Sequence, residues 1–168
     1  MRKSLEVISI VAFGYMAWIT YSALAGPNRL PDKIPTHFDA AGNVNGWGSP
    51  SMLLFLPIIA VALYTAITVV SRFPSAFNYP VRILPSARSQ VEALTLDMIA
   101  WIKTELLCLF ATIQNVMIHA AQGGPAKLNP LMVPAFIVAI FGTVGWHLVT
   151  VLRIARRQIV APKGSAGN

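Results

Sequence analysis

Four apolar runs divide the chain, and each is long enough to cross a bilayer. They predict helices over residues 5–25, 52–70, 90–122 and 131–154. About 20 consecutive apolar residues span a hydrocarbon core of about 30 Å. The pattern therefore predicts an all-α membrane protein, with four transmembrane helices in an antiparallel bundle that form a single domain over residues 1–160. The small and polar residues 161–168 predict a disordered tail.

Residues before the second and fourth runs predict where these helices begin. Ser49 with Pro50, and Asn129 with Pro130, are typical of a capping side chain followed by a proline in the first turn. Within the second run, Pro57 lacks a backbone N–H, and we expect it to kink the helix.

The third helix is predicted to begin before its apolar part. Ser89 and Glu92 have the spacing of a capping box, and the Gly-Gly-Pro sequence at 123–125 is a stop signal. A helix of roughly 33 residues measures ~50 Å at 1.5 Å per residue. Since this exceeds the bilayer core, its first turns should project into water or the interface. In the same helix, Lys103 is expected to extend to the inner interface.

The first run has two interpretations. Arg2 and Lys3 precede it, and the Ser-Ala-Leu-Ala-Gly sequence at 22–26 resembles a signal-peptide cleavage site. The apolar stretch is longer than the usual apolar region of a signal peptide. We therefore interpret it as the first transmembrane helix.

Composition narrows the class of protein. Hydrophobic residues make up 55% of the chain and charged residues 11%, against roughly 25% charged residues in ordinary soluble domains. The single cysteine, Cys108, cannot form a disulfide framework or a cysteine zinc cluster. No Ser-His-acid trio, phosphate-binding loop or cofactor fingerprint occurs in a plausible context. We expect neither an enzyme nor a bound cofactor or metal.

The positive charge, +7 overall, lies at the ends of the apolar runs. This placement favours contact with anionic lipid over nucleic-acid binding. One side carries Arg2, Lys3, Arg72, Arg82, Arg88, Arg153, Arg156, Arg157 and Lys163, and the other carries Arg29, Lys33 and Lys127. By the positive-inside rule, both termini are predicted in the cytoplasm and residues 26–51 outside it.

The predicted outer loop at 26–51 has the composition of a compact cap. Its prolines restrict the backbone, its glycines permit tight turns, and its apolar side chains provide anchors. The candidate partner-binding residues of this loop are Pro31, Ile34, Pro35, His37, Phe38, Gly42, Gly46 and Trp47.

The loop sequence LPDKIPTHFDAAGNVNGWGSPS resembles the signature loop of a bacterial membrane family, the domain of unknown function numbered 1648. Asn78 and Pro80, in a Phe-Asn-Tyr-Pro segment before the third helix, are similar to an inner-loop motif of the family's small members. The resemblance covers about residues 5–155. It implies a relation to SdpI-type immunity proteins, which protect a producing cell against a secreted toxic peptide and can hold a repressor at the membrane.

Polar side chains form a stripe along the third helix, within an arc of about 80° at 100° per residue. The stripe consists of Asp97, Glu105, Cys108, Thr112, Asn115 and His119. Ionisable groups in hydrocarbon are costly, so the stripe should face the bundle interior or a wet cavity. It fits an ion or proton path, a ligand pocket, or polar contacts that hold helices together.

Two further histidines, His147 and His37, are candidate ligands. His147 shares a face of the fourth helix with Thr143 and Thr150. An outer metal site would need His37, Asp39 and His119 to meet, and their spacing matches no metal motif.

Three hypotheses for function follow. The first is a bacterial inner-membrane protein that binds a peptide, lipid or protein partner, with an immunity or accessory role. The second is a small transporter lined by the polar stripe, acting as an oligomer. The third is a structural subunit of a larger membrane complex.

Overall fold

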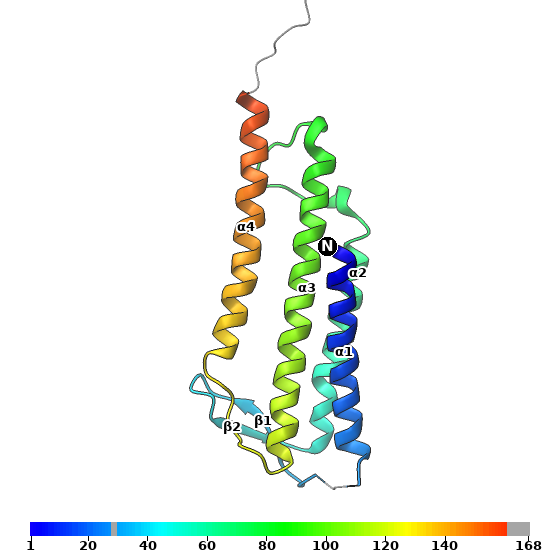
Figure 1. The fold of residues 1–168 in the computed structure, drawn as a ribbon, viewed down its shortest axis with the longest axis vertical. Helices are drawn as coiled ribbons and strands as arrows, with labels where there is room; N and C mark the ends of the chain where they lie inside the picture. The colour runs from blue at the N-terminus through cyan, green and yellow to red at the C-terminus, as the bar shows by residue number, and fades with distance from the viewer. Residues whose placement is uncertain (28–29, 161–168) are drawn as a thin grey trace, which may run out of the picture.

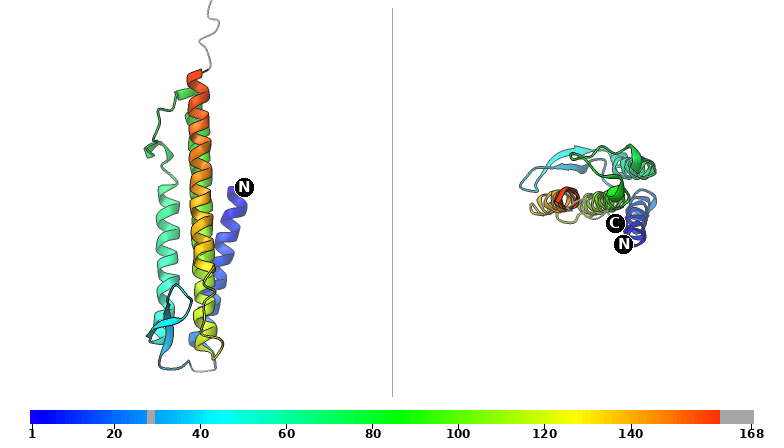
Figure 2. Two further views of the ribbon diagram at one scale, coloured as in Figure 1. Left: turned by 90° about the vertical axis from the view of Figure 1, so that its left-hand side faces the viewer. Right: turned by 90° about the horizontal axis from the view of Figure 1, so that it is seen from above.

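Four helices lie side by side in the computed structural model, which describes residues 1–27 and 30–160, with side chains to 157. They are α1 (Arg2–Ala25), α2 (Phe55–Val70), α3 (Pro85–Ala121) and α4 (Met132–Val160). Consecutive helices run in opposite directions (Figure 1). Seen along the long axis, α3 lies between α4 on one side and α1 and α2 on the other (Figure 2). The predicted tail at 161–168 falls outside the described residues.

Three segments of the described chain are long and apolar enough to cross a membrane. They are Arg2–Ala25, Pro50–Val70 and Met132–Arg157. The helix α3, which we predicted as a fourth span, is not among them. Its charged and amide side chains lower its hydropathy, although it is the longest helix and packs against the other three.

A small sheet corrects the prediction of an all-α fold. Strands β1 (Ile34–Phe38) and β2 (Val44–Gly48) form an antiparallel hairpin inside the predicted outer loop. The hairpin lies at the end of the molecule where α1 and α3 finish (Figure 1). Ile34 is fully buried there and packs in a cluster with Leu53 and Met117. Glycine and proline marked this segment as a turn-rich loop, and they concealed its two short strands.

The start of α3 differs from the prediction. The helix begins at Pro85, which occupies its first turn after Leu84, so Ser89 lies inside the helix and is not a cap. Glu92 accepts a hydrogen bond at 2.9 Å from Arg88, one turn earlier, instead of closing a capping box. A proline fits the first helical position because its missing N–H has no partner to lose there.

The start of α2 also corrects a prediction. Pro50 opens a short 3-10 helix, η1 (Pro50–Leu54), and α2 itself begins at Phe55. The Ser49 side chain bonds the Ser51 hydroxyl at 2.7 Å and makes no cap bond to the backbone. Pro57 therefore falls in the first turn of α2, where it breaks no internal helix bond and gives no reason for a kink.

Other predicted helix ends are confirmed. The Asn129 side chain accepts the backbone N–H of Leu131 at 3.0 Å ahead of α4. After α3, Gly123 adopts a φ of +90° and donates to the Ala120 carbonyl, while Gly124 donates to the His119 carbonyl at 3.0 Å. This pair of bonds is a Schellman motif, which needs a left-handed residue that glycine supplies without strain.

A charged cluster fastens α1, α2 and α3 together. The Lys103 ammonium group donates to Glu6 at 2.6 Å and to Thr68 at 3.2 Å, and it lies 4.4 Å from the ring centroid of Tyr64. The Tyr64 hydroxyl donates to the same Glu6 carboxylate. Lys103 is buried, so our expectation that it reaches the inner interface is wrong. Its acidic partner, on a different helix, holds it inside.

Neutral polar side chains continue this attachment between α1 and α3. The hydroxyls of Ser9 and Thr104 are 2.9 Å apart and buried. Further along, the buried Gln114 amide donates to the Thr20 hydroxyl at 2.8 Å and to the Leu53 carbonyl at 2.7 Å. The buried polar face of α3 is therefore built from Lys103, Thr104 and Gln114, which the predicted stripe did not include.

Removing one member of the charged cluster should destabilise the bundle. We expect Glu6→Ala to lower the free energy of unfolding by about 2 kcal/mol, less than a fully enclosed pair because the Glu6 side chain is 36% exposed. The double variant Glu6→Leu with Lys103→Met should recover most of this loss, because no buried charge is left without a partner. Unfolding of the micelle-bound protein by added sodium dodecyl sulfate measures both. Equal losses in the single and double variants would contradict the assignment.

Candidate functional site

The hairpin is attached to the connection between α3 and α4. Gly42, in the turn between the strands, has a φ of +79°, and its carbonyl accepts the N–H of Leu128 at 2.8 Å. Asn43 forms an isolated bridge with Lys127. A Cβ atom on Gly42 would lie 1.8 Å from the Leu128 carbonyl oxygen, so both backbone angle and space require glycine there.

Asp39 closes the hairpin turn. Its carboxylate accepts the backbone N–H of Asn43 at 2.8 Å, and its own N–H donates to the Asn43 carbonyl. The Asn43 N–H bond lowers the pKa of Asp39 below its ordinary value, because it stabilises the charged form. Asp39 thus has a structural task within the turn.

Most predicted outer-loop residues hold the hairpin in place. Ile34 and Pro35 are buried, and Phe38 is half-buried against the same cluster. Gly46 lies opposite His37 in the hairpin, where a Cβ would come within 2.7 Å of the His37 Cβ.

Three of the predicted outer residues remain open to the surroundings. Pro31 is exposed, and Trp47 is 59% exposed. The exposed His37 ring bonds the Asn45 side chain of the opposite strand. Of the candidate partner-binding residues, only these three side chains are exposed.

Substitution of Gly42 should detach the hairpin from the α3–α4 connection. We expect Gly42→Ala to destabilise the protein by about 2 kcal/mol or more, from the unfavourable φ together with the clash. Gly123→Ala is the matched control, since Gly123 has a similar φ with nothing within 4 Å of a Cβ. Thermal unfolding of both variants separates the effect of the clash with Leu128 from the effect of the positive φ. Equal losses of stability in the two variants would contradict the contribution of the clash.

The predicted polar stripe of α3 does not face the interior of this chain. Asn115 and His119 are exposed, and the remaining stripe residues are half-buried. The stripe lies between α1 and α4 and divides between two surface grooves, one beside each neighbouring helix. Helical periodicity placed the stripe residues on one face of α3. It could not show which helices lie beside that face.

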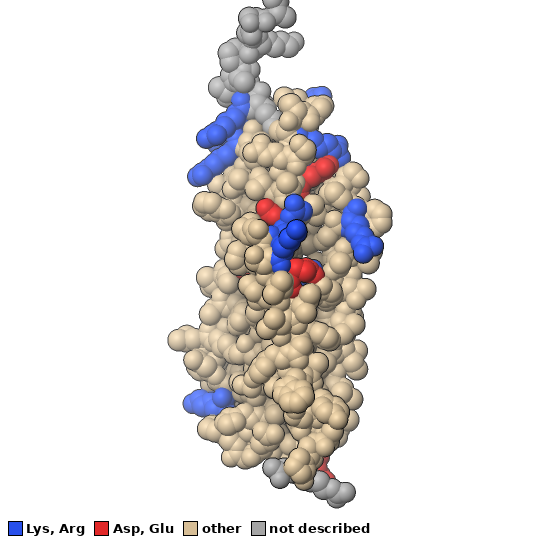
Figure 3. Space-filling view, turned by 45° about the vertical axis from the view of Figure 1, so that its right-hand side comes forward, with Lys and Arg blue, Asp and Glu red and all other residues tan. Residues whose placement is uncertain are grey.

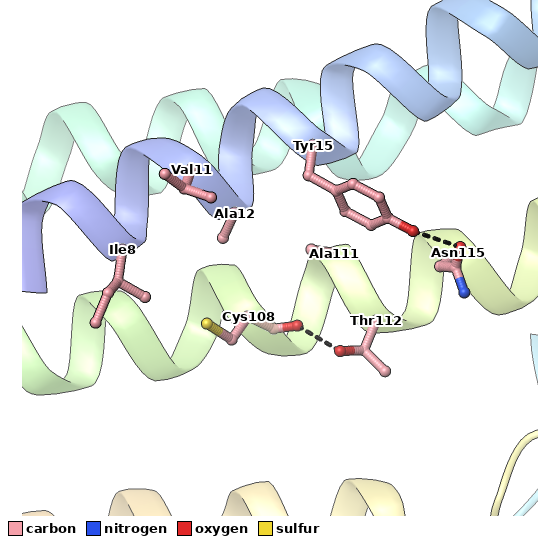
Figure 4. A pocket seen from close by; sticks show the side chains of 8 residues that line it. All are labelled: Ile8, Val11, Ala12, Tyr15, Cys108, Ala111, Thr112 and Asn115. Carbon is pink, nitrogen blue, oxygen red and sulfur yellow. Dashed lines mark hydrogen bonds between the residues drawn. The ribbon is translucent and has the colours of Figure 1, made fainter.

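The first groove lies between α1 and α3 and has a volume of about 470 Å³. Figure 4 shows the side chains of the two helices facing one another across it. Tyr15 donates to Asn115 at 2.8 Å, and Thr112 donates to the Cys108 carbonyl of its own helix at 2.7 Å. The Tyr15–Asn115 bond links α1 to α3, whereas the Thr112 bond stays within α3.

The second groove, between α3 and α4, holds the candidate functional site. Its volume is about 450 Å³, and we name it the α3–α4 groove. It is lined by Met1, Leu94, Asp97, Trp101, Glu105, Gly142, Thr143, Trp146 and His147. Trp146 is 69% exposed and Trp101 37%, so the groove is open along its side.

Glu105 and His147 are joined through Thr143. The Thr143 hydroxyl donates to Glu105 Oε1 at 2.7 Å, while the Thr143 carbonyl lies 2.7 Å from His147 Nδ1. Because a carbonyl can only accept, Nδ1 carries a proton, and Nε2 is the accepting atom of the neutral ring. Glu105 Oε2 is buried and has no hydrogen-bond partner among the described residues. The groove is thus lined by a carboxyl group and an imidazole ring that are joined through Thr143.

Asp97 lies at the end of the groove nearer the start of α3. It forms an ion pair with Arg2 at 3.0 Å. Met1 lines the groove near this pair. Of the two acids in the groove, Asp97 therefore already has a cation beside it.

The predicted inner-loop motif contacts the same helix pair. Asn78 and Pro80 line a smaller cavity of about 190 Å³, together with Tyr79 and His147. The Tyr79 hydroxyl is buried and has no partner among the described residues. The structure thus brings His147 next to both the motif and the α3–α4 groove. The sequence placed Thr143 and His147 on one face, but it gave no signal that Glu105 would meet them.

His119 and the outer residues do not converge. The His119 ring lies against Gly124, where a Cβ would approach its Nε2 within 2.5 Å. In the part of the chain that the structure describes, no three His, Cys, Asp or Glu residues are grouped as metal ligands.

Comparisons with known proteins agree with the sequence resemblance over part of the chain. Residues 7–61 match the family Domain of unknown function (DUF1648), a range that runs from α1 through the hairpin into α2. An uncharacterized protein of Archaeoglobus fulgidus is 26% identical over 149 residues, which cover 80% of this chain and 78% of that protein. No solved structure matches. The match supports the family over a shorter range than the 5–155 expected.

Proposed function

We propose that the chain is a multi-pass membrane protein in which all four helices cross the bilayer. The apolar windows of α1, α2 and α4 are only 22%, 11% and 11% buried, so their outer faces need an apolar surrounding. Val138, Phe141 and Trp146 on α4 are each about 70% exposed. Lipid is the solvent that suits such faces.

The inclusion of α3 rests on its burial. Its polar residues Lys103, Thr104 and Gln114 are enclosed by α1 and α2, so these side chains, which lower its hydropathy, face neighbouring helices and not lipid. Its 37 residues measure ~55 Å at 1.5 Å per residue, more than the hydrocarbon core. Because α3 lies beside α1, which crosses the bilayer in this proposal, α3 crosses it as well.

The distribution of charge supports cytoplasmic termini, and the inner membrane of a bacterium is proposed from the family resemblance. On the face in Figure 3, Lys and Arg gather toward one end and a broad band without charged residues follows. The basic residues at 72, 82, 88, 153, 156 and 157 belong to the end opposite the hairpin. The positive-inside rule assigns that end to the cytoplasm.

Within this arrangement we assign the chain a non-catalytic role, the binding of a single-chain amphiphile in the α3–α4 groove. The observation that carries this is the Glu105–Thr143–His147 group beside Trp101 and Trp146, in a groove open sideways among apolar faces. A headgroup would meet the polar atoms while its chain stays in lipid. An immunity or accessory role would use such binding to capture a membrane-active molecule.

A second candidate function is recognition of a protein or peptide partner by the hairpin. It is favoured by Trp47, which is 59% exposed and pairs with Pro35 at the end of the hairpin away from its turn. Aromatic residues in such positions commonly anchor interfaces.

The proposed orientation can be tested by cysteine labelling. In a Cys108→Ala background, Asn45→Cys should react with a membrane-impermeant maleimide in intact cells, whereas Arg82→Cys should react only after permeabilisation. The reason is that residue 45 belongs to the hairpin and residue 82 to the opposite end. Labelling of residue 45 only from the cytoplasmic side would overturn the topology.

The proposed binding can be tested by filling the groove. A Trp18→Phe, Trp47→Phe protein keeps only Trp101 and Trp146 as fluorophores. In nanodiscs, an uncharged single-chain amphiphile with a nitroxide beside its headgroup should quench them saturably. Gly142→Leu should abolish the saturable part, because Gly142 lines the groove and a Cβ there meets nothing within 4 Å.

Gly145→Leu is the matched control for this experiment. Gly145 also has space for a side chain but does not line the groove. It should leave the quenching unchanged. Saturable quenching that survives Gly142→Leu would contradict the proposed site.

A further inference from the structure

Glu105 has no cation among the described residues. Among the described residues, ion pairs join Arg2 to Asp97, Arg88 to Glu92 and Lys103 to Glu6. Glu105 Oε1 is satisfied by Thr143, while Oε2 is buried without a partner. An ionisable group in hydrocarbon is costly and normally has a partner that compensates it. The α3–α4 groove therefore has an acceptor that the described chain leaves unused.

Aromatic side chains flank this acceptor. Trp101 lies one turn before Glu105 on α3, and Trp146 lies across the groove on α4. The faces of indole rings attract cations, and tryptophan does so most strongly. A carboxyl group in a groove that two exposed indoles also line is the chemistry that recognises an ammonium group.

None of the protein's own cations pairs with Glu105 in the part of the chain that the structure describes, and this includes the terminal amine of Met1, which lines the groove. Arg2 is held by Asp97, eight residues before Glu105, which is ~12 Å along the helix at 1.5 Å per residue. Lys103 is enclosed on another face of α3 by Glu6 and Thr68. Glu105 is left for a cation that comes from outside the chain.

We infer that the α3–α4 groove selects amphiphiles with an ammonium headgroup, which pairs with Glu105 between Trp101 and Trp146. This inference rests on the proposed function and adds the sign of the headgroup charge. The alkyl chain of such a ligand would lie along the apolar surface of α4, where Val138 and Phe141 are exposed.

The test compares two nitroxide probes of equal chain length, one uncharged and one a dodecyltrimethylammonium. Both are titrated into nanodiscs of phosphatidylcholine that hold the Trp18→Phe, Trp47→Phe protein. The cationic probe should bind about tenfold more tightly, because a charge pair in low dielectric is strong. Glu105→Gln should remove this preference, whereas Glu92→Gln, on the same helix outside the groove, should keep it.

A second variant guards against a folding defect in Glu105→Gln. Trp146→Leu leaves the carboxyl group in place and should weaken cationic binding about threefold, with Trp101 as the remaining reporter. Equal affinity for the two probes, or a preference that survives Glu105→Gln, would overturn the inference. If the uncharged probe still binds and Gly142→Leu still blocks it, the proposed function stands, whereas absence of saturable quenching by either probe would end both.

Discussion

One ion pair inside apolar surroundings determines how the helices of this protein meet. Lys103 of α3 reaches Glu6 of α1 at 2.6 Å, and Tyr64 and Thr68 of α2 complete its contacts. A lone ammonium group at this depth would be expelled toward water. With its partners present, the same group fixes the register of three helices, and α3 becomes the element around which the others are arranged.

The central position of α3 explains why its polar residues have such different surroundings. Residues toward α1 and α2 are buried and bonded across the helices, as in the Ser9–Thr104 and Thr20–Gln114 contacts. Toward α4, the Glu105 carboxyl group lines a groove and retains an oxygen with no partner among the described residues. In the proposed function, stability and binding thus belong to different faces of one helix.

The sequence predicted the helices better than their contacts. Apolar runs located α1, α2 and α4, and the glycines at 123–124 and Asn129 marked helix ends correctly. Ser89 misled because a capping pattern can occur by chance inside a helix that a proline has already started. The prediction for Lys103 was wrong because its partner, Glu6, is 97 residues away in the sequence. A local sequence pattern cannot reveal a contact over that separation. The groove around Glu105 is a property of two helices, so periodicity on either one could not reveal it.

The same distance along the chain has a consequence for biogenesis. Ribosomes make α1 first, so Glu6 reaches the membrane well before Lys103 has been synthesised. During that interval the carboxyl group must stay near the headgroups or be neutralised by a proton, and α1 cannot settle to its final depth. On the proposed topology, we expect insertion of α1 to be completed only when α3 arrives, and we expect a nascent chain that stops before residue 103 to leave an unpaired acid that membrane quality control can detect.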